Sequence, residues 1–229
     1  MSAPTVIALH GNLGSSNDWQ RLEIEGLVAV DLWAFSGMSL EEFARFLTEE
    51  IRPEGERVVI AGYSLGGRLA LQAMASFPEA WAGAIILSAH PGLQSDMERE
   101  NRRAIDEEWA RKAQGIPWPK FLEEWNSQPV LSSSPFSEQQ LGLEGRRSAI
   151  SKAFHDWSLG TQSDLREPLK GFSPPVLWIT GARDRKFHQL GEEMSEVFSR
   201  FEHISLPGRG HRVLDPLAAV KIQDWLAHL

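Results

Sequence analysis

Residues 58–68 read VVIAGYSLGGR, and this stretch decides the fold that we predict for the chain. Its β-branched opening predicts a buried strand, and apolar residues at helical spacing follow it. Between them, Gly62, Ser64 and Gly66 fit the G-x-S-x-G pattern of a nucleophile elbow, although the same pattern also arises by chance in glycine-rich turns. Glycine removes the Cβ atoms that would collide in so tight a turn. The order of strand, turn and helix therefore predicts an exposed, reactive Ser64.

Two backbone N–H groups are predicted to form an oxyanion hole next to this serine. Leu65 begins the helix after the elbow, where the first backbone donors of a helix have no intrahelical partner. The apolar run at 5–9 ends in His10, Gly11 and Asn12. We expect the N–H of Asn12 to be the second donor, because glycine lets this loop approach a substrate. The alternative is a His-Gly pair that only ends a strand.

A serine hydroxyl is a poor nucleophile or base unless an imidazole takes its proton and a carboxylate orients that imidazole. Both partners are expected later in the chain, in the order serine, acid, histidine. Asp184 follows the apolar run at 176–180, and His211 lies in a glycine-rich loop before the last predicted helix. We predict that Ser64, Asp184 and His211 form a catalytic triad. Two alternatives stay open: His188 as the base, and a surface ion pair for Asp184.

Apolar runs alternate with helical patterns at both ends of the chain, which predicts an α/β fold with a mostly parallel sheet of about six strands flanked by helices. Ligands bind at the carboxyl ends of such strands, so the motifs above are expected at one edge of the sheet. The strands are expected at 5–9, 27–32, 58–60, 82–89, 176–180 and 203–206. Besides the elbow helix, helices are expected at 39–51, at 189–200 and from 215 onward.

Residues 93–171 interrupt this alternation. They contain charged helical stretches with tryptophans and prolines, and no strand-like run. We interpret them as a helical cap inserted into a single domain, whose core comprises residues 1–92 and 172–229. The serines at 132–134 are expected to form a loop within this cap.

The composition excludes several classes of protein. The chain of 229 residues has a net charge of -8, which argues against nucleic-acid binding, and it has no cysteine for disulfides or thiolate chemistry. The spacing of the histidines predicts no metal site. No apolar run is long enough to span a bilayer and no signal peptide is evident, so a cytoplasmic location is expected. The oligomeric state is left open.

Further motifs extend the pattern beyond the elbow. They are GYSLGGR at 62–68, HPGL at 90–93, Trp125 followed by QPV at 128–130, SLG at 158–160 with DLR at 164–166, and RDRKF at 183–187. Together they resemble the SHCHC synthases (2-succinyl-6-hydroxy-2,4-cyclohexadiene-1-carboxylate synthases) of menaquinone biosynthesis, which belong to the α/β-hydrolase superfamily. The resemblance spans elbow, cap and acid loop. It implies the α/β-hydrolase fold and a cofactor-free lyase that expels pyruvate from the precursor SEPHCHC, with the triad abstracting a proton.

The resemblance also implies a set of substrate-binding residues, namely Tyr63, Arg68, Arg102, Trp125 and Arg146. The substrate carries three carboxylates, and arginine pairs with carboxylates bidentately while keeping its charge. The expected partner is therefore a small polycarboxylate, with no nucleic acid, membrane, metal or other cofactor. For Arg102 and Arg146 the alternative is a solvated helix face, and Arg147 is adjacent to Arg146.

Two other functions are compatible with the same residues. A serine carboxylesterase or thioesterase acting on a small acidic ester needs the same triad, which it uses to form an acyl-enzyme. A non-catalytic ligand-binding module on the same scaffold is the third hypothesis. The intact set of Ser64, Asp184 and His211 makes that third hypothesis the weakest.

Overall fold

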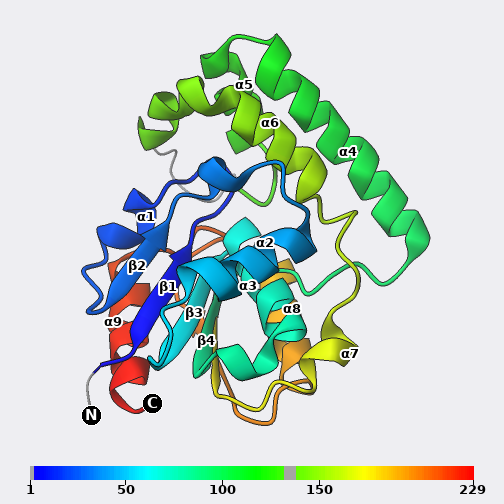
Figure 1. Ribbon diagram of the computed structural model, residues 1–229. Helices are drawn as coiled ribbons and strands as arrows, with labels where there is room; N and C mark the ends of the chain where they lie inside the picture. Colours follow the sequence, from blue (N-terminus) through cyan, green and yellow to red (C-terminus); the bar gives the residue numbers. More distant parts are fainter. Residues whose placement is uncertain (1–2, 132–137) are drawn as a thin grey trace.

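A six-stranded parallel sheet with the strand order β2-β1-β3-β4-β5-β6 forms the centre of the molecule. The computed structural model describes residues 3–131 and 138–229. Figure 1 shows the sheet below a separate layer of helices. The predicted fold class, a parallel sheet of about six strands flanked by helices, is confirmed. The strands are β1 (Thr5–Leu9), β2 (Leu27–Val30), β3 (Val58–Tyr63), β4 (Gly83–Leu87), β5 (Val176–Gly181) and β6 (Phe201–Leu206).

Helices of the described ranges fall into two groups. One group accompanies the strands: α1 (Asn17–Gln20), α2 (Leu40–Phe46), α3 (Leu65–Ser76), α7 (Arg166–Leu169), α8 (Arg185–Met194) and α9 (Pro216–Ala227), with the short turns η1 (Leu32–Phe35), η2 (Leu47–Ile51) and η3 (Pro78–Ala80). The other group lies above the carboxyl ends of the strands in Figure 1: α4 (Asp96–Gly115), α5 (Trp118–Asn126), η4 (Glu138–Arg146) and α6 (Arg147–Asp156).

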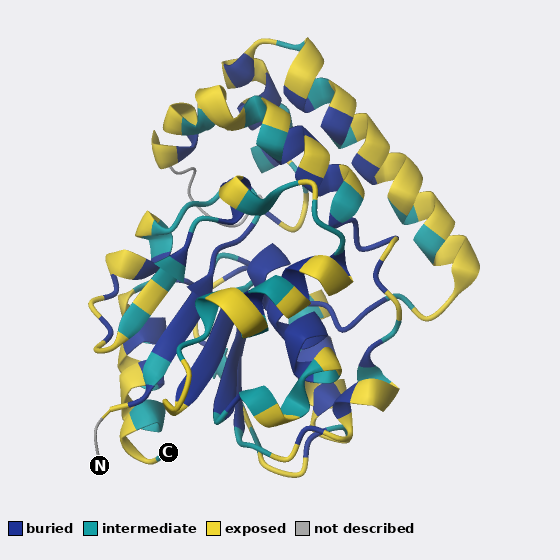
Figure 2. Ribbon diagram, in the orientation of Figure 1, coloured by how far each residue is buried: buried dark blue, intermediate teal, exposed yellow. Residues whose placement is uncertain are grey.

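Each face of the sheet has its own apolar core. In β3, Ile60 packs into a cluster that includes Trp118 and Trp157 from the upper helical layer, whereas Val59 packs into the cluster on the opposite face. Figure 2 shows the central strands mostly dark, because β1, β3, β4 and β5 are buried on both faces, whereas the edge strands β2 and β6 are mostly intermediate or exposed. This burial explains why the central strands read as continuous apolar runs and not as an alternating pattern.

The elbow between β3 and α3 is formed by a very close approach of backbone segments. A Cβ atom on Gly62 would lie 2.3 Å from the carbonyl oxygen of Gly66, and a Cβ atom on Gly66 would lie 2.2 Å from that of Leu9. Ser64, at the turn, has φ 53° and ψ -109°, a region that side-chain-bearing residues rarely adopt. The first turn of α3 is therefore pressed against the end of β1.

The helical cap contacts the core where α6 packs on η1 and where Arg68 of α3 donates to the Trp157 carbonyl oxygen. α4 begins with a capping box in which Ser95 and Glu98 bond each other's backbone N–H, and α4 packs along α6. α7 packs against α3 of the core. The division of the domain at residues 93 and 171 stays a prediction, and the loop predicted at 132–134 lies outside the described residues.

The structure corrects one helix that positions the site. α8 spans Arg185–Met194, whereas the sequence pattern predicted a helix at 189–200. It starts early because the Asp184 carboxylate accepts a hydrogen bond from the Phe187 N–H and caps the helix. Lys186 and Phe187 consequently lie in its first turn, next to the predicted triad acid.

Among the helices of residues 3–131 and 138–229, none combines the length and apolar character that a bilayer crossing requires.

Gly66→Ala tests the contact between elbow and β1. We expect it to lower the free energy of unfolding by about 3 kcal/mol, because the added methyl group collides with backbone atoms that cannot move aside. Urea denaturation measures the change. Gly115→Ala, at the end of α4 with open space around the new methyl group, is the matched control and should be neutral or slightly stabilising. Equal stability of the two variants would contradict the packing argument.

Candidate active site

Ser64, His211 and Asp184 form one hydrogen-bonded array at the carboxyl ends of the strands. The Ser64 Oγ lies 3.0 Å from His211 Nε2, and His211 Nδ1 lies 2.8 Å from the Asp184 Oδ2. A carboxylate only accepts, so Nδ1 carries the hydrogen and Nε2 is free to accept from the serine hydroxyl. Both His211 and Asp184 are buried. The structure thus brings together the three residues predicted as a triad.

His188, the alternative base, lies elsewhere. Its Nε2 is 3.5 Å from Glu192 on the next turn of α8, and its ring packs against His203. The geometry therefore favours His211 as the partner of the serine. Within the described ranges, no three His, Asp or Glu side chains are grouped in a way that could hold a metal ion.

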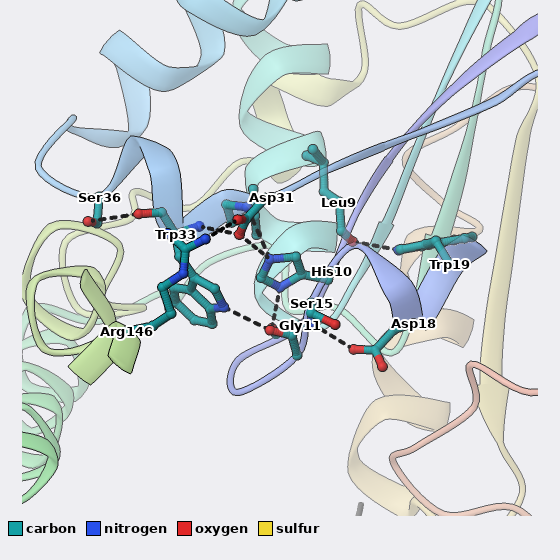
Figure 3. A network of polar contacts seen from close by, with 12 residues as sticks. Leu9, His10, Gly11, Ser15, Asp18, Trp19, Asp31, Trp33, Ser36 and Arg146 are labelled. Carbon is teal, nitrogen blue, oxygen red and sulfur yellow. Dashed lines mark hydrogen bonds and ion pairs between the residues drawn. The ribbon is translucent and has the colours of Figure 1, made fainter. Parts of the chain in front are cut away.

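A polar network that includes His10, Asp31 and Trp33 fixes the loop after β1 (Figure 3). Buried His10 donates from Nδ1 to the carbonyl oxygen of the next residue at 2.8 Å, and its Nε2 accepts from the Leu32 N–H at 3.0 Å. The Trp33 indole donates to the carbonyl oxygen of Gly14 at 2.8 Å. These bonds fix the loop that carries Asn12, whose side-chain oxygen is buried with no hydrogen-bond partner in residues 3–131 and 138–229. Preorganised backbone donors are what an oxyanion hole requires.

A cavity of about 250 Å³ joins this array to the cap. Its lining includes Ser64, His211 and both residues predicted for the oxyanion hole, Asn12 and Leu65. The charged residues among its described lining are unbalanced, with Asp18 as the one carboxylate against the cations Arg21, Arg68, Arg102, Lys186 and Arg212. A cationic cavity in a chain of net charge -8 is a local concentration of positive charge, which attracts anions.

Residues 6–220 match the profile described as the alpha/beta hydrolase family. The chain belongs to this family. It is also similar to named members: the 2-succinyl-6-hydroxy-2,4-cyclohexadiene-1-carboxylate synthase of Salmonella paratyphi C (strain RKS4594) is 29% identical over 209 residues, which cover 84% of this chain and 82% of that protein. The synthase of Salmonella heidelberg (strain SL476) is 29% identical over 212 residues, with the same coverage. The resemblance to the SHCHC synthases is thereby confirmed.

Solved structures share the fold of this α/β hydrolase. MenH from S. aureus has a TM-score of 0.84 at 21% identity, covering 100% of this chain and 95% of that one. A thermophilic esterase from Thermogutta terrifontis, solved with malate bound, has a TM-score of 0.76 at 20% identity, covering 99% and 90%. Because enzymes with different names share this likeness, it shows the architecture and leaves the reaction to the site.

Arg68 lies in the first turn of α3, is buried, and connects the core of the hydrolase to its cap. Its guanidinium donates to the Trp157 carbonyl oxygen at 2.6 Å and to the Gln162 side chain at 3.1 Å. Burial, and after it the charge of Arg102, lowers the pKa of Arg68 to about 9. It therefore stays charged at neutral pH while it lines the cavity.

Arg102 reaches the cavity from α4 of the cap. Its Nε donates to the buried Asp106 carboxylate at 2.8 Å, and Asp106 also accepts from the Ser158 hydroxyl at 2.7 Å. This positions the guanidinium and leaves its remaining N–H groups for a ligand. Asp106 is thus a positioning residue that the sequence did not reveal, because a carboxylate four residues from an arginine on a helix reads as an ordinary surface pair.

Arg146 is placed differently from the set implied by the resemblance. It does not line the cavity, and its guanidinium is half exposed and paired with Asp31 at 3.1 Å, as Figure 3 shows. The adjacent Arg147 also faces away, donating to the Ala113 carbonyl oxygen. Arg146 therefore links the cap to the loop after β2 and leaves the cavity to other cations.

The two predicted aromatic residues line the cavity. The Tyr63 ring lies 5.8 Å from that of His211, and a Cβ atom on Gly11 would lie 2.8 Å from the tyrosine ring, so glycine is required there. Burial raises the pKa of Tyr63 far above its usual value. Trp125 packs edge-to-face on Trp109 with ring centroids 5.1 Å apart, which fixes the cap wall.

Lining residues that sequence reasoning missed as site residues include Ser88, His90, Lys186 and Arg212. His90 and Lys186 lie in two of the motifs that carry the resemblance, HPGL at 90–93 and RDRKF at 183–187, but the sequence analysis assigned neither residue a role. Arg212 directly follows His211, and burial lowers its pKa. Ser88 gave no sequence signal, since serine after a buried strand is common in turns.

Ser64→Gly and Ser64→Ala test the backbone strain at the elbow. Both remove the hydroxyl, but only glycine adopts φ 53° and ψ -109° without a steric penalty. We expect the glycine variant to be more stable than the alanine variant by about 1 kcal/mol, after allowing for the greater freedom of glycine in the unfolded chain. Urea denaturation of both variants decides, and a more stable alanine variant would refute the strain.

Arg68→Gln and Arg146→Gln test the different placements of these arginines. Loss of Arg68 leaves a buried carbonyl oxygen without its donor, and we expect the free energy of unfolding to fall by roughly 2 kcal/mol. Loss of Arg146 removes an exposed ion pair, and the expected change is below about 1 kcal/mol. Thermal and urea unfolding of both variants measure the contrast. A larger loss for Arg146→Gln would overturn this description.

Proposed function

We propose that this α/β hydrolase is a lyase of the SHCHC synthase type, which removes pyruvate from SEPHCHC in menaquinone biosynthesis. The observation that carries the proposal is the union of a Ser-His-Asp array with a cavity whose described charged lining has a single carboxylate against five cations. The named relatives support it. The cavity favours a small polycarboxylate, and each step of the reaction can be assigned to residues of this chain without a cofactor.

Binding depends on cations that are held in place before the substrate arrives. Arg68 and Arg102 are both anchored by hydrogen bonds to cap groups. An arginine fixed in this way loses little side-chain entropy when it pairs with a carboxylate. The positive cavity also raises the local concentration of an anionic substrate around an acidic protein. Substrate orientation is thus assigned to arginines on two different layers of the fold.

Proton abstraction is assigned to Ser64 and His211. The hydrogen bond to His211 Nε2 makes the serine oxygen basic, so that it can take the proton from the carbon next to the succinyl carbonyl while its own proton passes to the imidazole. Asp184, held by the Phe187 N–H, stabilises the imidazolium that forms. No bond between serine and substrate is required.

The electrons released from the C–H bond move to the carbonyl oxygen. The N–H groups of Asn12 and Leu65 are suited to hold this enolate, because an oxyanion hole stabilises negative charge on a former carbonyl oxygen whether the product is an enolate or a tetrahedral adduct. When the electrons return, the C–O bond to the enolpyruvyl group breaks. The departing enolate takes up the proton held by His211 and becomes pyruvate.

Pyruvate release from SEPHCHC tests the function. The wild-type protein should release pyruvate far above the spontaneous rate, and Ser64→Ala should lower kcat/KM at least about 100-fold, because it removes the proposed base. Lactate dehydrogenase coupled to NADH oxidation measures the product. A neutral p-nitrophenyl ester, assayed in parallel, tests for an acyl-enzyme hydrolase that uses the same triad.

The two outcomes of this assay are distinct. Serine-dependent pyruvate release with little ester cleavage supports the lyase. Ester cleavage that is lost in Ser64→Ala, without pyruvate above background, would replace the lyase by a serine carboxylesterase or thioesterase.

A further inference from the structure

Three residues at the end of β4 and the start of α8 line the cavity and have no part in the reaction described above. They are Ser88, His90 and Lys186, and we refer to them as the β4 subsite. Ser88 is fully buried, its Oγ has no hydrogen-bond partner among the described residues, and its backbone is held at φ 44°. A strained residue with an unpaired buried hydroxyl is costly, and such features concentrate where a ligand is bound.

His90 presents a hydrogen-bond donor to the same space. Its Nδ1 accepts from the Gly92 N–H at 3.1 Å, so the hydrogen of the neutral ring is on Nε2, for which no partner exists among the described residues. The tight turn needs glycine, since Gly92 has φ 119°. Burial, and after it the charge of Lys186, lowers the pKa of His90 to about 3. The imidazole is therefore a neutral donor at physiological pH.

Lys186 adds a positive charge that has no direct ion pair within the described residues, although the more distant carboxylates of Asp184 and Glu98 act on it. Its Nζ lies 5.8 Å from the centre of the Phe187 ring, and it forms no ion pair or hydrogen bond with the described residues. Arg68 and Arg102 differ, because each already donates to the protein. Burial lowers the pKa of Lys186, as expected for an ammonium group removed from water. The Lys186 ammonium group is therefore a partly desolvated cation, and its N–H donors are available to an anion in the cavity.

The subsite lies directly beside His211 of the triad. The Phe187 ring packs on His211 with centroids 4.4 Å apart and meets the His90 ring edge-on at 6.5 Å. One aromatic ring therefore separates the two imidazoles. An anion bound by His90 and Lys186 would be held close to the atoms on which the triad acts.

We propose that Ser88, His90 and Lys186 form a carboxylate-binding subsite that holds the substrate carboxylate nearest to the reacting bonds. Two neutral donors and one ammonium match the two oxygens and the single charge of a carboxylate. The assignment of the ligand as part of a polycarboxylate substrate rests on the proposed function, whereas carboxylate binding by these residues does not.

Isothermal titration calorimetry with propane-1,2,3-tricarboxylate tests the subsite without any turnover. The wild-type protein should bind this probe saturably, and Lys186→Met should weaken binding roughly tenfold or more, because a charged hydrogen bond is lost. Lys186→Arg, which keeps the charge, should restore most of the affinity. Lys152→Met, on the exposed side of α6 away from the cavity, is the matched control and should bind as the wild type does.

The His90 ring offers a second measurement, in which binding is followed on the wild-type protein. In the wild-type protein, the Nε2 resonance of His90 should shift saturably during titration with the same probe, and His90→Gln assigns the resonance. No saturable binding to the wild type, equal affinity of Lys186→Met and wild type, or a His90 signal that stays fixed while the probe binds would each overturn the subsite.

These outcomes separate the subsite from the proposed reaction. A wild-type protein that binds the tricarboxylate through Lys186 but releases no pyruvate would retain the subsite and lose the lyase. A protein that releases pyruvate with an unchanged KM in Lys186→Met, together with unchanged probe affinity, would retain the lyase and lose the subsite.

Discussion

The contact between the first turn of α3 and the end of β1 is the constraint on which the rest of the site depends. A Cβ atom on Gly66 would overlap the Leu9 carbonyl oxygen, so only glycine lets the helix begin at this point. The approach forces Ser64 into its strained backbone conformation and aims its hydroxyl at His211. It also brings the loop after β1, with Asn12, to the same place. Ser64 and the N–H groups proposed as oxyanion donors are thus positioned by backbone packing, before any side chain selects a substrate.

The cap is attached to this elbow through the same helix. Arg68 lies one turn from the serine and donates to cap groups at Trp157 and Gln162. A buried guanidinium needs acceptors, and the cap supplies them only when it is seated over the cavity. The position of the cap and the position of the Arg68 guanidinium therefore depend on the same hydrogen bonds. Asp106 plays a similar part for Arg102, because it orients that side chain from within α4.

The net charge of the chain and the charge of its cavity have opposite signs. The chain has a net charge of -8, yet the described lining of the cavity is strongly cationic. Desolvation inside the cavity strengthens each interaction with an anion. Removal from water is also the main reason why the pKa values of Lys186 and His90 are lowered. Because His90 is neutral, it offers an N–H donor beside the Lys186 ammonium group without adding a further positive charge to the cavity.

The sequence by itself determined the parallel sheet, the elbow and the residues Ser64, Asp184 and His211, because these depend on local backbone constraints and on chain order, which a linear pattern records. It did not determine which cations face the cavity. Arg146 was implied to bind the substrate, Lys186 was given no role, and only the packing of the cap and of α8 turns Arg146 outward and Lys186 inward. The start of α8 was misplaced for a related reason, since its cap is the same carboxylate that orients His211. Side-chain direction depends on tertiary contacts between segments far apart in the chain, and no local pattern contains them.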